Sequence, residues 1–340
     1  MEHLGLVGLA DSGHARLFSA LTGLDAATSS EKVLGVVQLP DHRLDELAAM
    51  SESKSVVPAT FEIMYIPGLS TEPGKGLGSR LLGQLRDCDA VLFVLRATDG
   101  NDPSSDLATL EYELVLADLA SVEQRLGKQQ RLYKGDKTLG PEIKALERAI
   151  EVLGDGTPVY RSDLSADERT LLGPVFLLTN KPVLPVVNVA VEQLDDADAI
   201  AKELGDDALS VCLELEGDPD VVAAQGAERA ELLADLGVPE SVVPRLARSA
   251  YQLLGLRTFL TTGDKESRAW GFRAGARAPE CAGVIHSDLE RGFIRAEVIH
   301  WDELLELGSW AKAKEAHKLR VEGKDYVVAD GDVLEIRFNV

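Results

Sequence analysis

The stretch Met1–Leu24, MEHLGLVGLADSGHARLFSALTGL, decides the fold of this chain. A short apolar run meets a glycine-punctuated turn, and a segment with apolar residues at helical spacing follows. Gly8 and Gly13 stand at the spacing of a phosphate-binding loop, which precedes a helix N-terminus and binds anions through backbone N–H groups. The next two residues of such a loop are Lys and Ser or Thr, but here they are His14 and Ala15. The sequence therefore predicts the frame of a nucleotide site without its main side-chain ligands.

Two interpretations of this loop stay open. It is either a strand–helix turn kept for folding, or a weak anion site that uses backbone N–H groups and survives the loss of the lysine. A third role, His14 as a substitute phosphate ligand, is also open. The candidate nucleotide contacts are Gly8, Ala10, Asp11, Ser12, Gly13, His14 and Ala15.

Length and composition are those of a globular protein with more than one domain. The chain has 340 residues, of which 45% are hydrophobic and 27% charged. It contains no apolar run near the ~18 residues that suggest a membrane span, and no signal peptide, so we expect a cytoplasmic protein without a membrane partner. Cys88, Cys212 and Cys281 are far apart and odd in number, which favours neither a disulfide framework nor a zinc site.

The net charge of −22 disfavours generic binding to nucleic acid, and we expect no DNA partner. The acidity is uneven, because the segment from Thr258 to the end holds 12 Lys and Arg against 15 Asp and Glu. In this segment Arg291 and Arg295 flank Phe293. Two interpretations of this pattern are open: the two arginines contact RNA or a partner, or they belong to the ordinary polar face of a sheet.

Alternating strand and helix signals predict a mostly parallel α/β sheet. Strands are expected at 31–39, 60–66, 90–95, 183–191 and 208–215, and helices at 43–50, 80–86, 107–130, 141–153, 227–236, 244–254 and 301–307. The helices at 107–130 and 141–153 form a predicted hairpin, which is either a partner-binding arm or a cover for the site. A second, β-type hairpin is expected around Asp330-Gly331.

Several stretches of the chain resemble one known family. The C-terminal ones are the most specific: LRTFLTTGDKESRAW (256–270), GVIHSDLERGFIRAEVI (283–299) and EGKDYVVADGDVLEIRFNV (322–340). Further matches are GVVQLPDHRLDELA (35–48), LEYELVLADL (110–119), DLSADER (163–169) and KPVLPVVNVA (181–190). Over nearly its full length the chain resembles the YchF subfamily of Obg-type P-loop GTPases and ATPases.

The resemblance implies a P-loop NTPase-like G domain with a helical-hairpin insertion and a C-terminal TGS domain, which is a β-grasp, ubiquitin-like module. The expected boundaries are 1–102 and 173–257 for the G domain, 103–172 for the insertion and 258–340 for the TGS domain. It also implies an ATP-preferring nucleotide switch that contacts ribosomes. The TGS domain or the helical hairpin would carry the ribosome or RNA contact.

The nucleotide motifs depart from those of the family. The family's GLPNVGKS is GLADSGHA here, and its DIAGL is YIPGL, so Tyr65 and Gly68 are the remnant of switch II. Switch I is shortened to TSSEKVL and lacks its threonine, the 70–79 loop is shorter, and a catalytic histidine has no counterpart. In place of the base-reading N-x-x-E, Asn188 and Val189 either touch a base edge or cap a turn.

Phosphoryl transfer depends on positioning and charge, and the missing groups supply both. We therefore expect a pseudo-NTPase, with no catalytic residue, no required cofactor, weak ATP or GTP binding and no Mg²⁺ site. In this interpretation the chain is a ribosome- or RNA-linked binding protein. One alternative is a slow ATPase or GTPase with an unconventional site, and another is a pocket for a different small anion.

Overall fold

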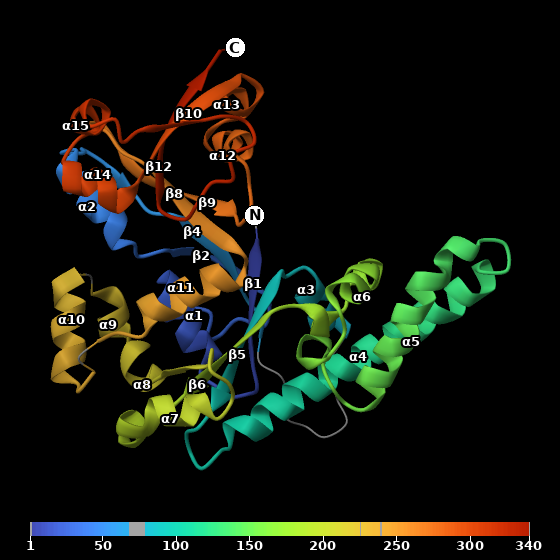
Figure 1. Cartoon of the computed structure of the whole chain (residues 1–340). Helices are drawn as coiled ribbons and strands as arrows, with labels where there is room; N and C mark the ends of the chain where they lie inside the picture. The colour runs from blue at the N-terminus through green and yellow to red at the C-terminus, as the bar shows by residue number, and fades with distance from the viewer. Residues whose placement is uncertain (1, 68–78, 225, 239, 340) are drawn as a thin grey trace. The chain divides into compact units, whose positions relative to one another are not determined.

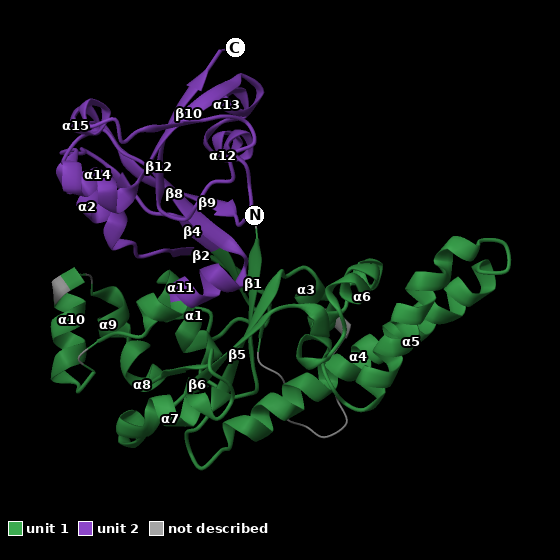
Figure 2. Ribbon diagram, in the orientation of Figure 1, with its two compact units in different colours: residues 1–36, 62–246 green, residues 37–61, 247–340 purple. Residues whose placement is uncertain are grey.

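The computed structural model describes residues 2–67, 79–224, 226–238 and 240–339 (Figure 1). They form two compact units: unit 1 comprises residues 1–36 and 62–246, and unit 2 comprises residues 37–61 and 247–340 (Figure 2). Residues 37–61 thus belong with the C-terminal part of the chain. The four-part division expected from the sequence differs from these compact units, and its boundaries stay a prediction.

The first sheet has the strand order β2-β4-β1-β5-β6-β7. Neighbours from β4 through β7 pair in parallel. The strands are β1 (His3–Gly8), β2 (Val33–Gln38), β4 (Thr60–Tyr65), β5 (Ala90–Arg96), β6 (Val183–Asn188) and β7 (Leu209–Val211). These strands confirm the predicted α/β class, and the central ones are buried on both faces, as parallel strands usually are.

Because parallel strands end at the same edge of a sheet, the residues at their carboxyl ends come together. These are Gly8 of β1, Tyr65 of β4, Arg96 of β5 and Asn188 of β6, and the register sets Arg96 opposite Asn188. This edge is where ligands of open α/β sheets bind.

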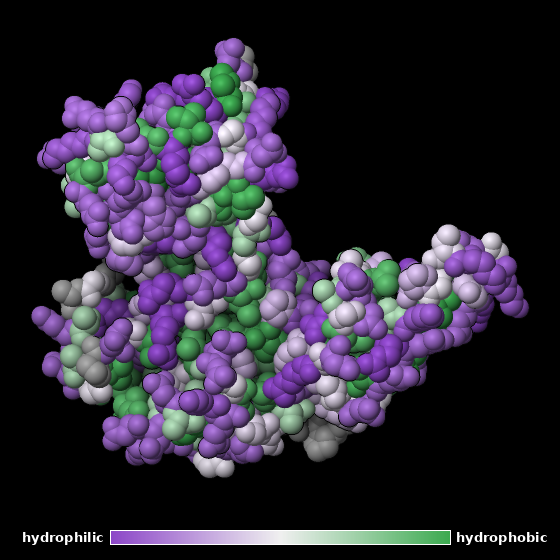
Figure 3. Space-filling model, in the orientation of Figure 1, coloured by the Kyte–Doolittle hydropathy of each residue, from purple (hydrophilic) through white to green (hydrophobic). Residues whose placement is uncertain are grey.

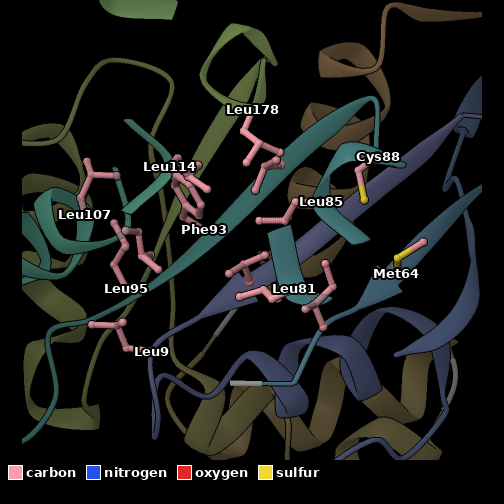
Figure 4. Packing of buried hydrophobic residues seen from close by; sticks show 14 residues of the cluster. Leu9, Met64, Leu81, Leu85, Cys88, Phe93, Leu95, Leu107, Leu114 and Leu178 are labelled. Atoms are coloured by element: carbon pink, nitrogen blue, oxygen red, sulfur yellow. The ribbon is translucent and has the colours of Figure 1, made fainter. Parts of the chain in front are cut away.

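The helices of unit 1 before the insertion are α1 (His14–Thr22) and α3 (Ser79–Arg86), and those after it are α7 (Ala197–Lys202), α8 (Leu213–Glu216), α9 (Pro219–Ala223) and α10 (Gly226–Asp235). The boundary between the two units falls within α11 (Val243–Leu253), after Leu246. Side chains from the sheet, α3 and the next helix gather in one buried cluster, in which Phe93 and Leu95 of β5 lie with Leu107 and Leu114 (Figure 4).

The predicted helical hairpin is confirmed. It consists of α4 (Pro103–Leu132) and α5 (Gly140–Gly154), followed by α6 (Ala166–Leu171). Asp102 caps α4 by accepting from the backbone N–H of Ser104, and Pro103 occupies the first turn, where its missing N–H costs nothing. Val122 of α4 and Leu146 of α5 are buried in a separate core, while hydrophilic side chains cover much of the hairpin on the face drawn in Figure 3.

Unit 2 contains the second sheet, with the order β11-β10-β12-β8-β9-β3. Its strands are β3 (Val56–Val57), β8 (Leu256–Thr261), β9 (Ser267–Arg273), β10 (Phe293–His300), β11 (Arg320–Glu322) and β12 (Asp332–Phe338). Its helices are α2 (His42–Met50), α12 (Ala278–Ile285), α13 (Ser287–Arg291), α14 (Trp301–Leu307) and α15 (Trp310–Glu315). The antiparallel pairs β8–β9 and β10–β12 meet through the parallel pair β12–β8, as in the expected β-grasp module.

Two local predictions are wrong. The turn at Asp330-Gly331 does not close a hairpin, because β12 pairs antiparallel with β10 and Asp330 accepts instead from the backbone N–H of Thr258. The strand predicted at 208–215 stops at Val211, since α8 begins at Leu213. Among the described residues, no helix combines the length and hydropathy needed to cross a membrane.

Candidate functional site

The loop between β1 and α1 has the backbone that its glycine spacing predicts. Asp11 and Gly13 both have positive φ angles, of 62° and 84°, and Ser12 donates its N–H to the Leu9 carbonyl at 3.1 Å. A Cβ on Gly13 would lie 2.8 Å from Nδ2 of Asn188, so a side chain there would clash. The strand, the tight turn and the helix N-terminus of a phosphate-binding loop are therefore present.

Ser12 folds its side chain inward. It is fully buried, and a Cβ on Gly8 would lie only 2.0 Å from its Oγ. The same Oγ lies 2.9 Å from Nδ1 of His14. A neutral hydroxyl and a neighbouring imidazole thus fill the space beside Gly8.

His14 packs against an aromatic ring instead of pointing to solvent. Its ring stacks on that of Tyr65, with 5.1 Å between the ring centroids and 13° between the planes. The Tyr65 ring also contacts Phe18, with 5.7 Å between the ring centroids. Tyr65 ends β4, so the pairing of β1 with β4 brings together two residues that are far apart in the sequence. The structure joins the two positions at which the sequence departs most from a nucleotide site.

Burial lowers the pKa of His14 from 6.5 to about 4, and the backbone of Ile66 opposes this shift only in part. The side chain is 6% exposed, and within the part of the chain that the structure describes its Nε2 has no partner within hydrogen-bonding geometry. At neutral pH the imidazole is uncharged. It therefore cannot supply the charge that a lysine brings to a phosphate.

The pH dependence of stability tests this burial. When burial holds the pKa of a histidine lower in the folded state than in the unfolded state, the unfolded state takes up a proton first as the pH falls. The folded state is therefore fully stable above the unfolded-state pKa, and it loses stability as the pH falls from that value toward the folded-state pKa. From pH 7 to pH 5, His14 should therefore account for a loss of about 2 kcal/mol in the free energy of unfolding. His14→Phe should lack this loss in urea titrations at both pH values. Parallel profiles for the two proteins would contradict the burial of a neutral imidazole.

Asn188 is engaged at both ends of its side chain. Its Oδ1 accepts from the backbone N–H of Leu213 and its Nδ2 donates to the Ser12 carbonyl, each at 3.1 Å. The side chain joins the β1–α1 loop to the segment after β7. These bonds leave one N–H donor of Nδ2 and one lone pair of Oδ1 available, so the base contact and the cap both stay predictions for Asn188. Val189 beside it is 1% exposed.

Sequence reasoning missed Arg96, which ends β5 at the same edge. Its guanidinium donates to the carbonyl of Ala10 at 3.2 Å and forms a bidentate pair with Asp106 at the start of α4. Its charge is therefore partly neutralised and its fork is occupied. A charged residue directly after the buried run AVLFVL was the available signal.

A cavity of about 670 Å³ lies along the outer face of α1, between that helix and the α8–α9 segment. Among the described residues that line it, Arg16 is the cation, and Asp25, Glu214 and Asp218 are the acids. The lining carries more negative than positive charge, which does not suit a polyphosphate.

The remaining predicted site residues are Gly68, Arg291 and Arg295. Gly68 falls outside the described residues. Arg291 and Arg295 belong to unit 2 and are both exposed, while Phe293 between them is buried. Arg291 pairs with Asp288, and Arg295 lies opposite Arg337 in the sheet. Among the described residues, no group of three or more His, Cys, Asp or Glu side chains is arranged to hold a metal ion.

Comparisons with known proteins cover nearly the whole chain. Residues 256–339 match the family model YchF-GTPase_C, described as a protein of unknown function (DUF933). Proteins named ribosome-binding ATPase YchF are similar throughout: that of Bacillus subtilis is 38% identical over 363 residues and that of Pasteurella multocida 39% identical over 360, each with 99% of both chains covered. The Schizosaccharomyces pombe YchF GTPase structure gives a TM-score of 0.85 at 27% identity, over 99% of this chain and 97% of that one.

Proposed function

This chain belongs to the YchF family, and we propose that it binds ribosomes, with a nucleotide site whose phosphate and metal contacts are weakened. The ribosome link is supported by the names of relatives that share 37–39% of their residues with it over 99% of the chain. The weakening is supported by one observation above all: His14 is neutral, buried and stacked on Tyr65.

The chain has a net charge of −22, so most of its surface is repelled by the phosphate groups of a ribosome. The ribosome contact should therefore use a local group of basic side chains. Unit 2 offers Arg291 and Arg295, which are exposed and lie in the least acidic part of the chain. Arg291 already pairs with Asp288, but both groups are solvent-exposed, and an exposed pair is worth little energy. Its charge remains available to a phosphate.

Replacing Arg291 and Arg295 together with alanine should weaken co-sedimentation with ribosomes and flatten its salt dependence by roughly 0.7–0.9 units of slope per lost phosphate contact. Arg277→Ala with Lys324→Ala removes the same charge from exposed positions of the same unit and is the matched control. An equal loss of ribosome binding in both double variants would show that the effect comes from the change in net charge and not from a specific contact. Unchanged association would move the contact to the α4–α5 hairpin, and no association at low salt would contradict ribosome binding itself.

These point variants replace a simpler deletion of the C-terminal segment. In unit 2, β3 pairs with β9, and Ser53 of the 37–61 segment bonds to Ser267 at 2.8 Å. Removing residues 258–340 would strip these partners from α2 and β3. A loss of binding after such a deletion would then report misfolding as readily as a lost contact.

A second candidate function is ATP hydrolysis. It is favoured by the printed names of the relatives, which are ribosome-binding ATPases, and by the loop and helix N-terminus that this chain retains. Backbone N–H groups at such a terminus bind phosphate without a lysine. ATP turnover that disappears in Ala15→Asp, which places a carboxylate in the first turn of α1, would support this candidate, while release of phosphate no faster than in a protein-free control would exclude it.

A further inference from the structure

Unit 2 contains a cavity of about 510 Å³ whose described lining includes none of the residues of the nucleotide motifs. Residues on both segments of the unit surround it: the loop that leads into α2, the end of α11, the start of β8, Trp301 at the start of α14, and Asp330. The charged residues of its described lining are Asp41, Arg43, Arg248, Arg257 and Asp330, and His42 adds an imidazole ring.

The two carboxylates in this cavity, Asp41 and Asp330, already have partners. Arg43 forms a bidentate ion pair with Asp41, with Nε–Oδ1 and Nη2–Oδ2 distances of 2.8 and 2.7 Å. Its Nη1 lies 2.7 Å from Oδ2 of Asp330. The other oxygen of Asp330 accepts from the backbone N–H of Thr258 at 2.8 Å. Both carboxylates thus have partners within the unit, so they are poor ligands for a cation.

The donors, in contrast, remain available. Arg248 is exposed and makes no hydrogen bond or ion pair with any residue that the structure describes. Arg257 donates only Nη1, to the carbonyl of Leu256 at 2.7 Å, within the same described part of the chain. A guanidinium carries five N–H donors, so most of those in this pair are free. A ligand that matches the cavity must therefore be rich in acceptors and negatively charged.

Two aromatic rings stand at the same cavity. His42 and Trp301 contact edge to face, with 5.5 Å between centroids and 89° between planes. The backbone behind them leaves no spare room, because a Cβ on Gly331, whose φ is +86°, would lie 2.7 Å from Cδ1 of Trp301 and 3.2 Å from Nη1 of Arg43. The two rings and the Arg43 guanidinium are therefore packed together on one side of the cavity, which Arg248 and Arg257 also line.

We propose that this cavity binds the phosphate of a nucleotide, with Arg248 and Arg257 on the phosphate oxygens and the His42–Trp301 pair against the base. Guanidinium groups match phosphate geometry by paired N–H donors, and aromatic side chains stack on any base. The nucleotide is either free or part of a single-stranded RNA. This site is distinct from the proposed ribosome contact, because neither Arg291 nor Arg295 is among its described lining residues.

Fluorescence titration of the full chain tests the site with four probes: uridine, uridine monophosphate, and a labelled and an unlabelled 12-residue oligouridine. Phosphate-bearing probes should bind and uridine should not. Arg248→Ala with Arg257→Ala should weaken binding at least tenfold, because each lost charge-assisted contact is worth about that factor or more. The matched control is again Arg277→Ala with Lys324→Ala.

The probes also identify the source of the phosphate. Equal affinity for the monophosphate and the oligomer supports a free nucleotide, and binding of the oligomer alone supports RNA. The proposal is overturned if neither probe binds, if uridine binds as well as its phosphate, or if the double variant binds like the control. Ribosome co-sedimentation of the same variants separates the two proposals, because losing Arg248 and Arg257 should leave a contact through Arg291 and Arg295 in place.

Discussion

Replacing His14 with lysine and Ala15 with serine is expected to raise the affinity for ATP roughly 10- to 150-fold without producing turnover. The lysine would restore one charge-assisted phosphate contact, worth about 1.5–3 kcal/mol. Turnover should stay absent, because Tyr65 would still stand at the metal side of the loop, at the carboxyl end of β4. Calorimetric titration and a phosphate-release assay measure the two effects separately.

The chain offers a matched control for this variant. Ala316 and His317 are neighbouring exposed residues of unit 2, so Ala316→Ser with His317→Lys makes the same two chemical changes far from the loop in sequence. Affinity for ATP should not change in this control. Full hydrolysis from the two changes at His14 and Ala15 would show that the other departures in the site matter little, and an unchanged affinity would show that the loop cannot present a lysine to phosphate.

Asp118→Ala is expected to lower the free energy of unfolding by about 3–5 kcal/mol. Asp118 of α4 is fully buried and accepts three hydrogen bonds: from the N–H of Leu178 at 2.9 Å, and from the N–H and hydroxyl of Thr179, each at 2.7 Å. Alanine would leave these buried donors without an acceptor. Each such donor costs about 1–3 kcal/mol, and local relaxation recovers part of the sum.

Urea unfolding measures this loss, and hydrogen exchange locates it. Exchange should accelerate at Leu178 and Thr179, in the short segment that precedes β6, because their N–H groups lose their acceptor. Glu123→Ala, an exposed change on the same helix, is the control and should shift stability by no more than about 0.5 kcal/mol. Equal stability of Asp118→Ala and Glu123→Ala would contradict a role for Asp118 in holding the hairpin to the sheet.

Periodicity and glycine spacing predicted the elements that depend on local sequence. The strand before Gly8, the helix after Gly13 and the two long helices of the hairpin are examples, because capping, apolar spacing and turn residues determine them locally. The resemblance to a family supplied the order of the larger parts. It did so most firmly in the C-terminal segment, where the matched stretches are longest.

Contacts between distant residues were not predictable in this way. The two-residue strand β3 has no periodicity of its own and exists through its pairing with Ser267 and Arg268. The stack of His14 on Tyr65 depends on the register of β1 against β4, and the inward turn of Ser12 depends on the absence of a side chain at Gly8. The sequence identified His14 and Tyr65 as departures from a nucleotide site, but their contact is a property of the folded sheet.

Calorimetric titration of the unmodified protein with ATP, in the presence and absence of Mg²⁺, tests the weakened nucleotide site most directly. A neutral, buried His14 and an aromatic ring at Tyr65 supply neither the charge nor the oxygen ligand on which Mg-dependent binding relies. We therefore predict no saturable binding at micromolar ATP and no change when Mg²⁺ is added. Micromolar affinity that requires Mg²⁺ would contradict the proposal and establish this chain as a nucleotide-using member of its family.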